Sequence, residues 1–291
     1  MNFASSLRHE LAARALEYAK SQALPHWLSY GEVPIVCFAP DERQLRHGNF
    51  LRESYKAIQA NPAWRGRLAK IHPQGRICLP RTERGLWMEL DSCTSSDALL
   101  MNIFCHPKVP RSQHVLAMLG VESDAVPHFG YKARVPLANG KFDRTEVDME
   151  FGNLLVEAKL TEGDFQRAEK RVLASYRDFA EVFDAELLRQ SETHYLSYQL
   201  LRNVLAAHAR QASFCVLLDA RRPDLIEAWY AVMRCVKPPE LRSALRVLTW
   251  QELAPMLPAS LPPFLASKYG IRAQCPRGSG EPDRGQFRSC F

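Results

Sequence analysis

The sequence predicts an α/β fold in which helices flank a central mixed β-sheet, preceded by a mainly helical N-terminal region. Strand-like runs alternate with helical patterns from about residue 95 to residue 257, and a helix crosses over between two sets of strands, which favours a mixed sheet. Of the 291 residues, 46% are hydrophobic, which suffices for a substantial core. We expect an N-terminal region over residues 1–90, a core over 91–271 and a disordered tail over 272–291, which is rich in Gly, Pro, Arg and Ser.

The N-terminal region begins with an amphipathic pattern. Apolar residues recur at helical spacing from Leu7 to Ala19, and Pro25 ends the pattern. Residues 33–38 predict a short strand, and residues 49–59 predict a second helix.

The segment over residues 41–85 is strongly basic. It holds ten Lys and Arg against four acidic residues, a surplus of 10 − 4 = +6 that equals the net charge of the chain. Lys and Arg supply most sequence-independent affinity for DNA because they neutralise its phosphates. We therefore expect Arg65, Arg67 and Lys70 to contact a duplex; the alternative is a solvated basic surface.

The core shows helix caps and short strands in sequence. Ser95 or Ser96 can cap a helix that ends near Phe104, and Gly120 follows a second short helix. Strands are expected at residues 129–137, 146–151, 154–160, 213–219 and 245–248, and helices at 113–119, 164–179, 195–210, 223–236 and 250–257.

Residues 145–160 predict a β-hairpin around a Gly152–Asn153 turn, because both turn residues tolerate positive φ. The implied register places Asp148 opposite Glu157 and Glu146 opposite Lys159, and side chains alternate between the two faces of a strand. One face then carries Glu146, Asp148, Glu150, Glu157 and Lys159. The other face is apolar and belongs to the core: Val147, Met149, Phe151, Leu154, Val156, Ala158 and Leu160.

Acidic residues gathered on one sheet face need an explanation, because like charges opposite each other destabilise an antiparallel pair. A divalent cation resolves the conflict, since Mg²⁺ binds through one or two carboxylates together with substrate phosphate. Lys159 would then stand beside the metal, where an ammonium can orient or deprotonate water. Two simpler interpretations stay open: a half-exposed hairpin with a solvated charged face, and a cross-strand pair of Lys159 with Glu146.

The spacing Asp148…Glu157-Ala158-Lys159 on consecutive strands resembles the PD-(D/E)XK nuclease superfamily. Residues 156–165, 198–203 and 95–104 resemble segments of its bacterial restriction-endonuclease-like subgroup, in the expected order. The resemblance implies a restriction endonuclease-like core and a Mg²⁺ ion, which Mn²⁺ can replace. It also implies roles for individual residues: metal ligands Asp148, Glu157 and the carbonyl of Ala158; a catalytic ammonium on Lys159; and Gln199 and Arg202 orienting water or phosphate near the metal. For Gln199 and Arg202, which share a helix face, a role on the helix surface stays open.

The sequence departs from the family pattern at two places. Val147 stands where the motif has proline. The acid that the first core helix supplies is not obvious: Asp97 lies at the start of that helix, whereas Glu89 and Glu122 lie outside it. A second metal site is therefore in doubt.

The expected function is Mg²⁺-dependent hydrolysis of double-stranded DNA by an endonuclease. The alternatives are an inactive nucleic-acid-binding protein with a nuclease fold and a metal-dependent phosphodiesterase acting on RNA or nucleotides. A homodimer that cuts both strands stays open. The chain has no C-x-x-C spacing, leader or apolar run of about 20 residues, so we expect a cytoplasmic bacterial protein with reduced cysteines and no membrane contact.

Overall fold

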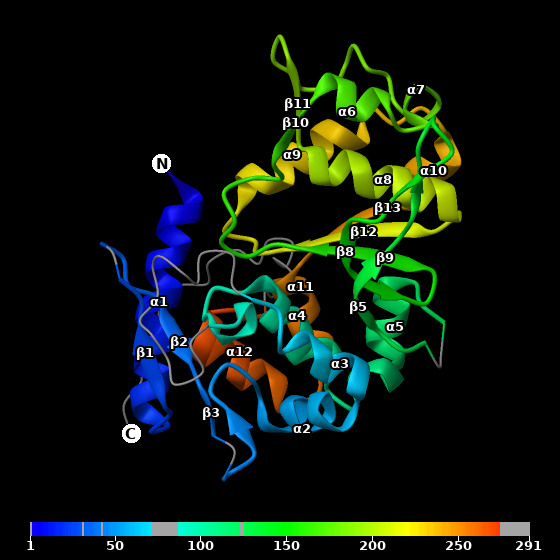
Figure 1. The fold of residues 1–291 in the computed structure, drawn as a ribbon. Helices are drawn as coiled ribbons and strands as arrows, with labels where there is room; N and C mark the ends of the chain where they lie inside the picture. The colour runs from blue at the N-terminus through cyan, green and yellow to red at the C-terminus, as the bar shows by residue number, and fades with distance from the viewer. Residues whose placement is uncertain (1, 31, 42, 72–86, 123–124, 274–291) are drawn as a thin grey trace, which may run out of the picture.

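A five-stranded mixed sheet lies at the centre of the computed structural model, which describes residues 2–30, 32–41, 43–71, 87–122 and 125–273 (Figure 1). The strand order is β13–β12–β9–β8–β5. The strands are β5 (His128–Lys132), β8 (Glu146–Phe151), β9 (Leu154–Ala158), β12 (Ser213–Leu218) and β13 (Leu245–Thr249). β9, β12 and β13 run parallel, whereas β9, β8 and β5 are antiparallel neighbours. The predicted α/β class with a mixed sheet is confirmed.

Burial along the strands follows from their place in the sheet. β12 is central and parallel to both neighbours, and its residues after Ser213 are all buried, as expected for a strand covered on both faces. β8 alternates between buried and half-buried residues. Its buried residues Val147, Met149 and Phe151 belong to the apolar set that the hairpin predicts, whereas β9 is buried at every residue, Leu155 and Glu157 included.

One face of the sheet is covered by helices that follow β9 in the chain (Figure 1). They are α6 (Lys170–Ala174), α7 (Phe179–Val182), α8 (Tyr198–Arg210), α9 (Pro223–Met233) and α10 (Pro239–Ser243). At the centre of this layer the Trp229 ring meets the Phe214 ring edge-on, with 5.3 Å between centroids.

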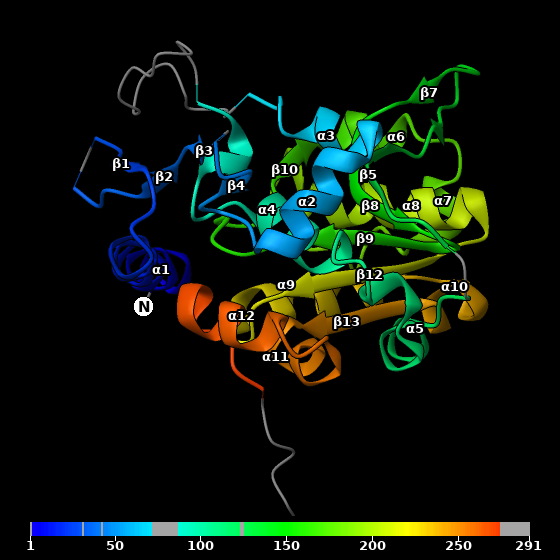
Figure 2. The same ribbon diagram turned by 90° about the horizontal axis from the view of Figure 1, so that it is seen from below.

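The opposite face is covered by helices from both ends of the chain. They are α1 (Phe3–Ser21), α4 (Ser96–Phe104), α5 (Gln113–Leu119), α11 (Trp250–Leu253) and α12 (Leu261–Tyr269), with 3-10 turns at η1 (Glu89–Asp91), η2 (Val109–Arg111) and η3 (Ala254–Met256). Figure 2 shows α1 beside α12, and Leu7 and Leu11 of α1 share the apolar cluster of α12.

The N-terminal region combines helices with short strand pairs. Its remaining elements are β1 (His26–Leu28), β2 (Val36–Phe38), β3 (Pro40–Asp41), β4 (Arg46–His47), α2 (Arg52–Ala60) and α3 (Pro62–Arg67). The predicted first helix, the strand near residue 36 and the second helix are present, whereas α3 was not expected. Trp64 of α3 donates through Nε1 to the carbonyl of Pro127 at 2.9 Å, which holds α3 against β5.

The predicted helix over residues 164–179 is confirmed only at residues 170–174, which form α6. Residues 167–169 form β10 (Arg167–Glu169), which pairs with β11 (His194–Leu196). The Asp164 carboxylate accepts from the Gln166 backbone N–H at 2.7 Å, and Gln166 has a φ of 60°, so the backbone turns before a helix can begin.

The predicted strand over residues 129–137 is divided in two. Arg134, with a φ of 57°, separates β5 from β6 (Val135–Pro136), which pairs with β7 (Phe142–Asp143). α8 begins three residues later than predicted because Ser197 adopts a φ of 60°. The two predicted caps are confirmed: Ser95 Oγ accepts from the Ala98 N–H at 3.1 Å, and Gly120 is left-handed after α5.

Two predictions lie wholly or partly outside the described residues. These are the disordered tail, beyond residue 273, and the part of the basic segment over residues 72–86. Among the described helices none has both the length and the apolar character needed to cross a membrane.

Candidate active site

The β8–β9 hairpin has the predicted register. Phe151 pairs with Leu154, Glu150 with Leu155 and Met149 with Val156. Beyond these pairs the Asp148 side chain bonds to the backbone of the neighbouring strand: its Oδ2 accepts from the Ala158 backbone N–H at 2.7 Å. The carboxylate of one strand is therefore fixed against the backbone of the other.

Glu157 and Lys159 form a buried ion pair. Lys159 Nζ lies 2.8 Å from Glu157 Oε1, and the two residues are 5% and 2% exposed. The Lys159 N–H donates to the Leu217 carbonyl at 2.8 Å, so β12 holds the end of this strand. Both simpler interpretations are wrong for this pair, because Lys159 is not bound to Glu146 and neither charge is on a solvated face.

Helix α8 supplies polar partners for this pair. Asn203 Nδ2 donates to Glu157 Oε2 at 2.7 Å, and Arg202 donates to Asn203 Oδ1 and, at 2.8 Å, to the Glu146 carbonyl. Gln199 stands one turn before Asn203, and its N–H donates to the carbonyl of Phe165 at 3.0 Å. Its Oε1 is buried without a partner among the described residues.

The start of α4 brings a third carboxylate to the site. Asp97 is 4% exposed and close enough for its charge to act on Asp148. Arg67 of α3 bridges Asp97 Oδ2 and Glu146 Oε2, each at 2.8 Å. Lys70 reaches Asp97 and Glu89, each at 2.9 Å. Asp97, which the sequence places at the start of this helix, thus adds its charge to the surroundings of Asp148.

The residues predicted to contact nucleic acid occupy different environments. Arg67 and Lys70 lie at the carboxylates of the site, and Arg202 is 4% exposed beneath β8. Arg65 lies on the exposed side of α3, and makes no ion pair with another described residue. Of the four residues, Arg65 has the exposed position expected of a residue that contacts phosphate.

Two further residues lie in the motif segments of the sequence but were given no role there. Asn203 could have been found from its spacing of four from Gln199, which puts both on one helix face. Glu162 accepts from Ser96 Oγ at 2.5 Å and from the Leu160 N–H at 2.7 Å. It thereby joins the end of the β8–β9 hairpin to the start of α4.

The electrostatics of the site show crowded negative charge. Burial raises the pKa of Asp148 well above its usual value, and the charges of Glu157 and Asp97 raise it further, against the lowering effects of Lys159 and the Ala158 N–H. Burial alone would lower the pKa of Lys159, but the carboxylates of Glu157, Glu162 and Asp148 outweigh it and raise that pKa, so the ammonium stays charged.

The residues present fit a hard divalent cation. Among the described residues no three His, Cys, Asp or Glu side chains are grouped so as to hold a metal by themselves. Mg²⁺ does not need such a cage, because it retains water and is bound by one or two carboxylates with substrate phosphate. Asp148 and Glu157 are oxygen donors of this kind, and a cation between them would relieve the repulsion that raises the pKa of Asp148.

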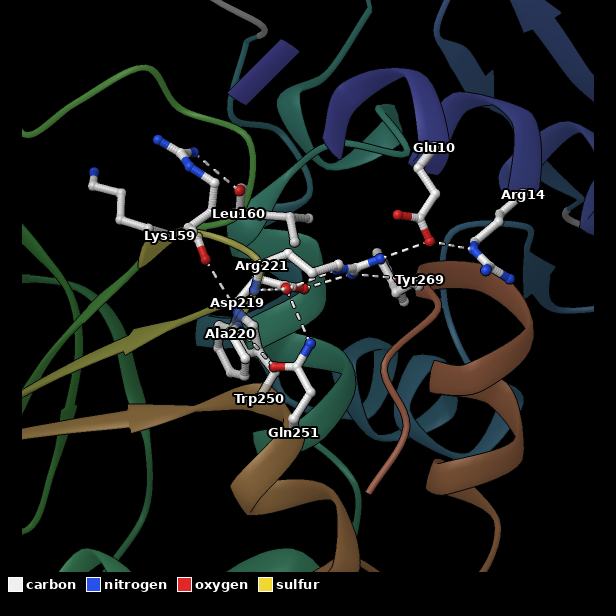
Figure 3. A network of polar contacts seen from close by, with 11 residues as sticks. Glu10, Arg14, Lys159, Leu160, Asp219, Ala220, Arg221, Trp250, Gln251 and Tyr269 are labelled. Carbon is white, nitrogen blue, oxygen red and sulfur yellow. Dashed lines mark hydrogen bonds and ion pairs between the residues drawn. The ribbon is translucent and has the colours of Figure 1, made fainter. Parts of the chain in front are cut away.

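Behind the hairpin a polar network fixes the end of β9. Trp250 Nε1 donates to the Lys159 carbonyl at 3.1 Å, while Gln251 and Arg221 hold Asp219 (Figure 3). Arg221 also pairs with Glu10 of α1 at 2.8 Å. The Lys159 side chain points away from this network in Figure 3, so its backbone is anchored while its ammonium faces Glu157.

Comparison with known proteins gives one match. The family model described as restriction endonuclease associating with ARP matches residues 25–270. Comparison with curated proteins and with solved structures gives no match. The matched range includes the whole sheet, both of its helical layers apart from α1, and every residue of the site. The chain therefore belongs to the family of restriction endonucleases associating with ARP.

Proposed function

We propose that the protein is a Mg²⁺-dependent endonuclease that hydrolyses phosphodiester bonds of double-stranded DNA, with a site of the PD-(D/E)XK type. The observation that carries the proposal is the buried Lys159–Glu157 pair beside Asp148. Burying charges costs several kcal/mol per ion. Chains retain such groups above all where chemistry uses them, and the family membership points to nuclease chemistry.

Each residue of the site has a defined task in this reaction. Asp148 and Glu157 would hold the metal, with the Ala158 carbonyl beside them. Asp148 Oδ2 is fixed by the Ala158 N–H and Glu157 Oε2 by Asn203, so both carboxylates are preorganised. The metal, when bound, supplies Lewis-acid activation of water and neutralises phosphate charge.

Lys159 supplies positive charge at a fixed position. Its ammonium is held by Glu157 and lies 5.6 Å from the centre of the Phe165 ring, on which it rests. A charge fixed before the substrate arrives stabilises a developing negative charge without reorganisation. Lys159 is therefore the group that neutralises charge on the phosphate as water attacks.

The sharpest test uses Asp148→Asn. An asparagine oxygen can still accept from the Ala158 N–H, and loss of the charge relieves the repulsion from Glu157 and Asp97. We expect stability to urea to be unchanged or increased, and cleavage of supercoiled plasmid in Mg²⁺ to fall about 1,000-fold. Addition of EDTA should stop the wild-type reaction.

Glu150→Gln is the matched control. Glu150 stands two residues from Asp148 on the same strand, but its carboxylate binds Arg210 at 2.7 Å, away from the metal ligands. Plasmid cleavage by this variant should stay at the wild-type rate. Cleavage by Asp148→Asn at that rate would refute the site, and a wild type that cuts neither methylated nor unmethylated plasmid would refute the activity.

A further inference from the structure

A second divalent cation at this site would need a further carboxylate. Asp97, in the first turn of α4, is a third carboxylate whose charge acts on Asp148, as that of Glu157 does. Three carboxylates around one site can hold two divalent ions, as in nucleases and polymerases with paired metals. The number of ions therefore depends on whether the Asp97 carboxylate is available.

Two basic side chains of this chain bind the Asp97 carboxylate. Arg67 Nη2 and Lys70 Nζ lie 2.8 and 2.9 Å from the same oxygen, Oδ2. Arg67 also forms an ion pair with Glu146, and Lys70 with Glu89, so two basic side chains bind three carboxylates. The Arg67 side chain is 13% exposed and that of Asp97 is 6% exposed, so water screens their attraction little.

The position of Arg67 is built into the fold. Gly130 of β5 has a φ of +65°, and a Cβ there would lie 2.2 Å from Arg67 Nη1 and 2.9 Å from Glu146 Oε2. Any other residue would displace the guanidinium. The Trp64 ring packs edge-on against Phe129 with 6.2 Å between centroids, so α3 is docked on the same strand that provides the opening.

Formal charge is better compensated around Asp97 than around Lys159. The carboxylates whose charges act on Lys159 are Glu157, Glu162 and Asp148. With the ammonium included, their formal charge is −3 + 1 = −2. On the other side, Arg67 and Lys70 offset two of the three charges of Asp97, Glu146 and Glu89, leaving −3 + 2 = −1.

We propose that Arg67 and Lys70 act as an internal cation at Asp97, so that the site takes a single divalent ion, between Asp148 and Glu157, and Asp97 is not a metal ligand. This inference rests on the proposed metal-dependent function. Arg67 and Lys70 are then positioning residues of the site, in place of the duplex contacts that the basic segment predicts for them.

The test is the number of Mn²⁺ ions bound by the full chain, read from the electron paramagnetic resonance signal of free Mn²⁺. Wild type should bind one equivalent, Asp97→Asn should also bind one, and Asp148→Asn should bind none. Two equivalents in wild type that fall to one in Asp97→Asn would overturn the inference and leave the proposed function standing. Binding that Asp148→Asn does not reduce would overturn the metal site of the proposed function itself.

Removal of the internal cation gives an independent readout. In Arg67→Met/Lys70→Met, Asp97 loses both partners, and a second Mn²⁺ should bind and be lost again when Asp97→Asn is added. A folded double variant that still binds one ion would contradict the inference. If the double variant does not fold, the comparison of wild type with Asp97→Asn decides. Arg65→Met, on the exposed side of the same helix, is the control and should bind one ion.

Discussion

Both carboxylate oxygens of Glu157 are engaged, Oε1 with Lys159 Nζ and Oε2 with Asn203 Nδ2. Arg202 holds Asn203 in turn through Oδ1, so a chain of hydrogen bonds from α8 fixes the carboxylate. Such a chain sets one rotamer for each member, because each donor faces one acceptor at hydrogen-bond distance. At the scale of single residues the site is therefore preorganised, whereas Gln199 Oε1 and Arg67 Nε beside it are buried without a partner among the described residues.

Gln199→Leu should separate stability from activity. The Gln199 Oε1 is buried without a partner among the described residues, and an unsatisfied buried acceptor costs about 1–3 kcal/mol. We expect the variant to unfold at the same or a higher urea concentration than wild type, whereas plasmid cleavage falls about 10- to 100-fold. If cleavage is unaffected, Gln199 has no role in orienting water or phosphate.

At the scale of elements, the segment after β9 is held from two sides. Glu162 binds Ser96 at the start of α4, and Arg222 at the start of α9 donates to the carbonyls of Glu162 and Gly163 at 2.6 and 3.1 Å. Arg222 is fully buried and pairs with Asp224 at 2.8 Å. Helices on both faces of the sheet therefore fix the path of the loop that follows Lys159.

Arg222→Met should destabilise the protein by about 3 kcal/mol, because it leaves Asp224 and two partly buried carbonyls without their donor. The free energy of unfolding in urea measures this loss. Arg189→Met is the matched control: its partner is Glu227, and the two side chains are 45% and 70% exposed. That variant should lose less than about 1 kcal/mol. Equal losses in the two variants would contradict the role of Arg222.

Elements set by local sequence were predictable, and those set by distant contacts were not. The Gly152–Asn153 turn determines the hairpin register from Phe151–Leu154 to Met149–Val156, and Asp148 and Glu157 come close together beyond it. The segment over residues 164–179 has helical periodicity, yet its residues 167–169 pair with β11, about 27 residues further on, and only residues 170–174 begin the helix. For the same reason the sequence did not show that Arg67 binds Asp97, which lies 30 residues further along the chain. Nor did it show that the absence of a side chain at Gly130 leaves room for the Arg67 guanidinium.

At the scale of the whole molecule, the last helix ties the two ends of the chain together. Lys268 of α12 is 1% exposed and donates to the backbone and side-chain oxygens of Asn49 and, at 3.1 Å, to the Tyr269 hydroxyl. Its ammonium also lies 5.0 Å from the centre of the Phe38 ring. The N-terminal region is therefore joined to the core by a buried amine whose hydrogen-bond partners among the described residues are all neutral.

This amine predicts how stability changes with pH. Burial lowers the pKa of Lys268 well below its ordinary value of 10.5. Between the folded-state pKa and 10.5 the unfolded chain binds more protons than the folded one, so stability rises with pH in that window, by about 1.4 kcal/mol for each unit of pKa difference.

Urea unfolding of wild type and Lys268→Met at several pH values between about 7 and 10 measures the effect. The free energy of unfolding of wild type should rise relative to the variant as the pH increases. Lys20→Met, which removes an exposed amine from α1, should show no such trend, and a constant difference between wild type and Lys268→Met would mean that the buried amine keeps its proton throughout.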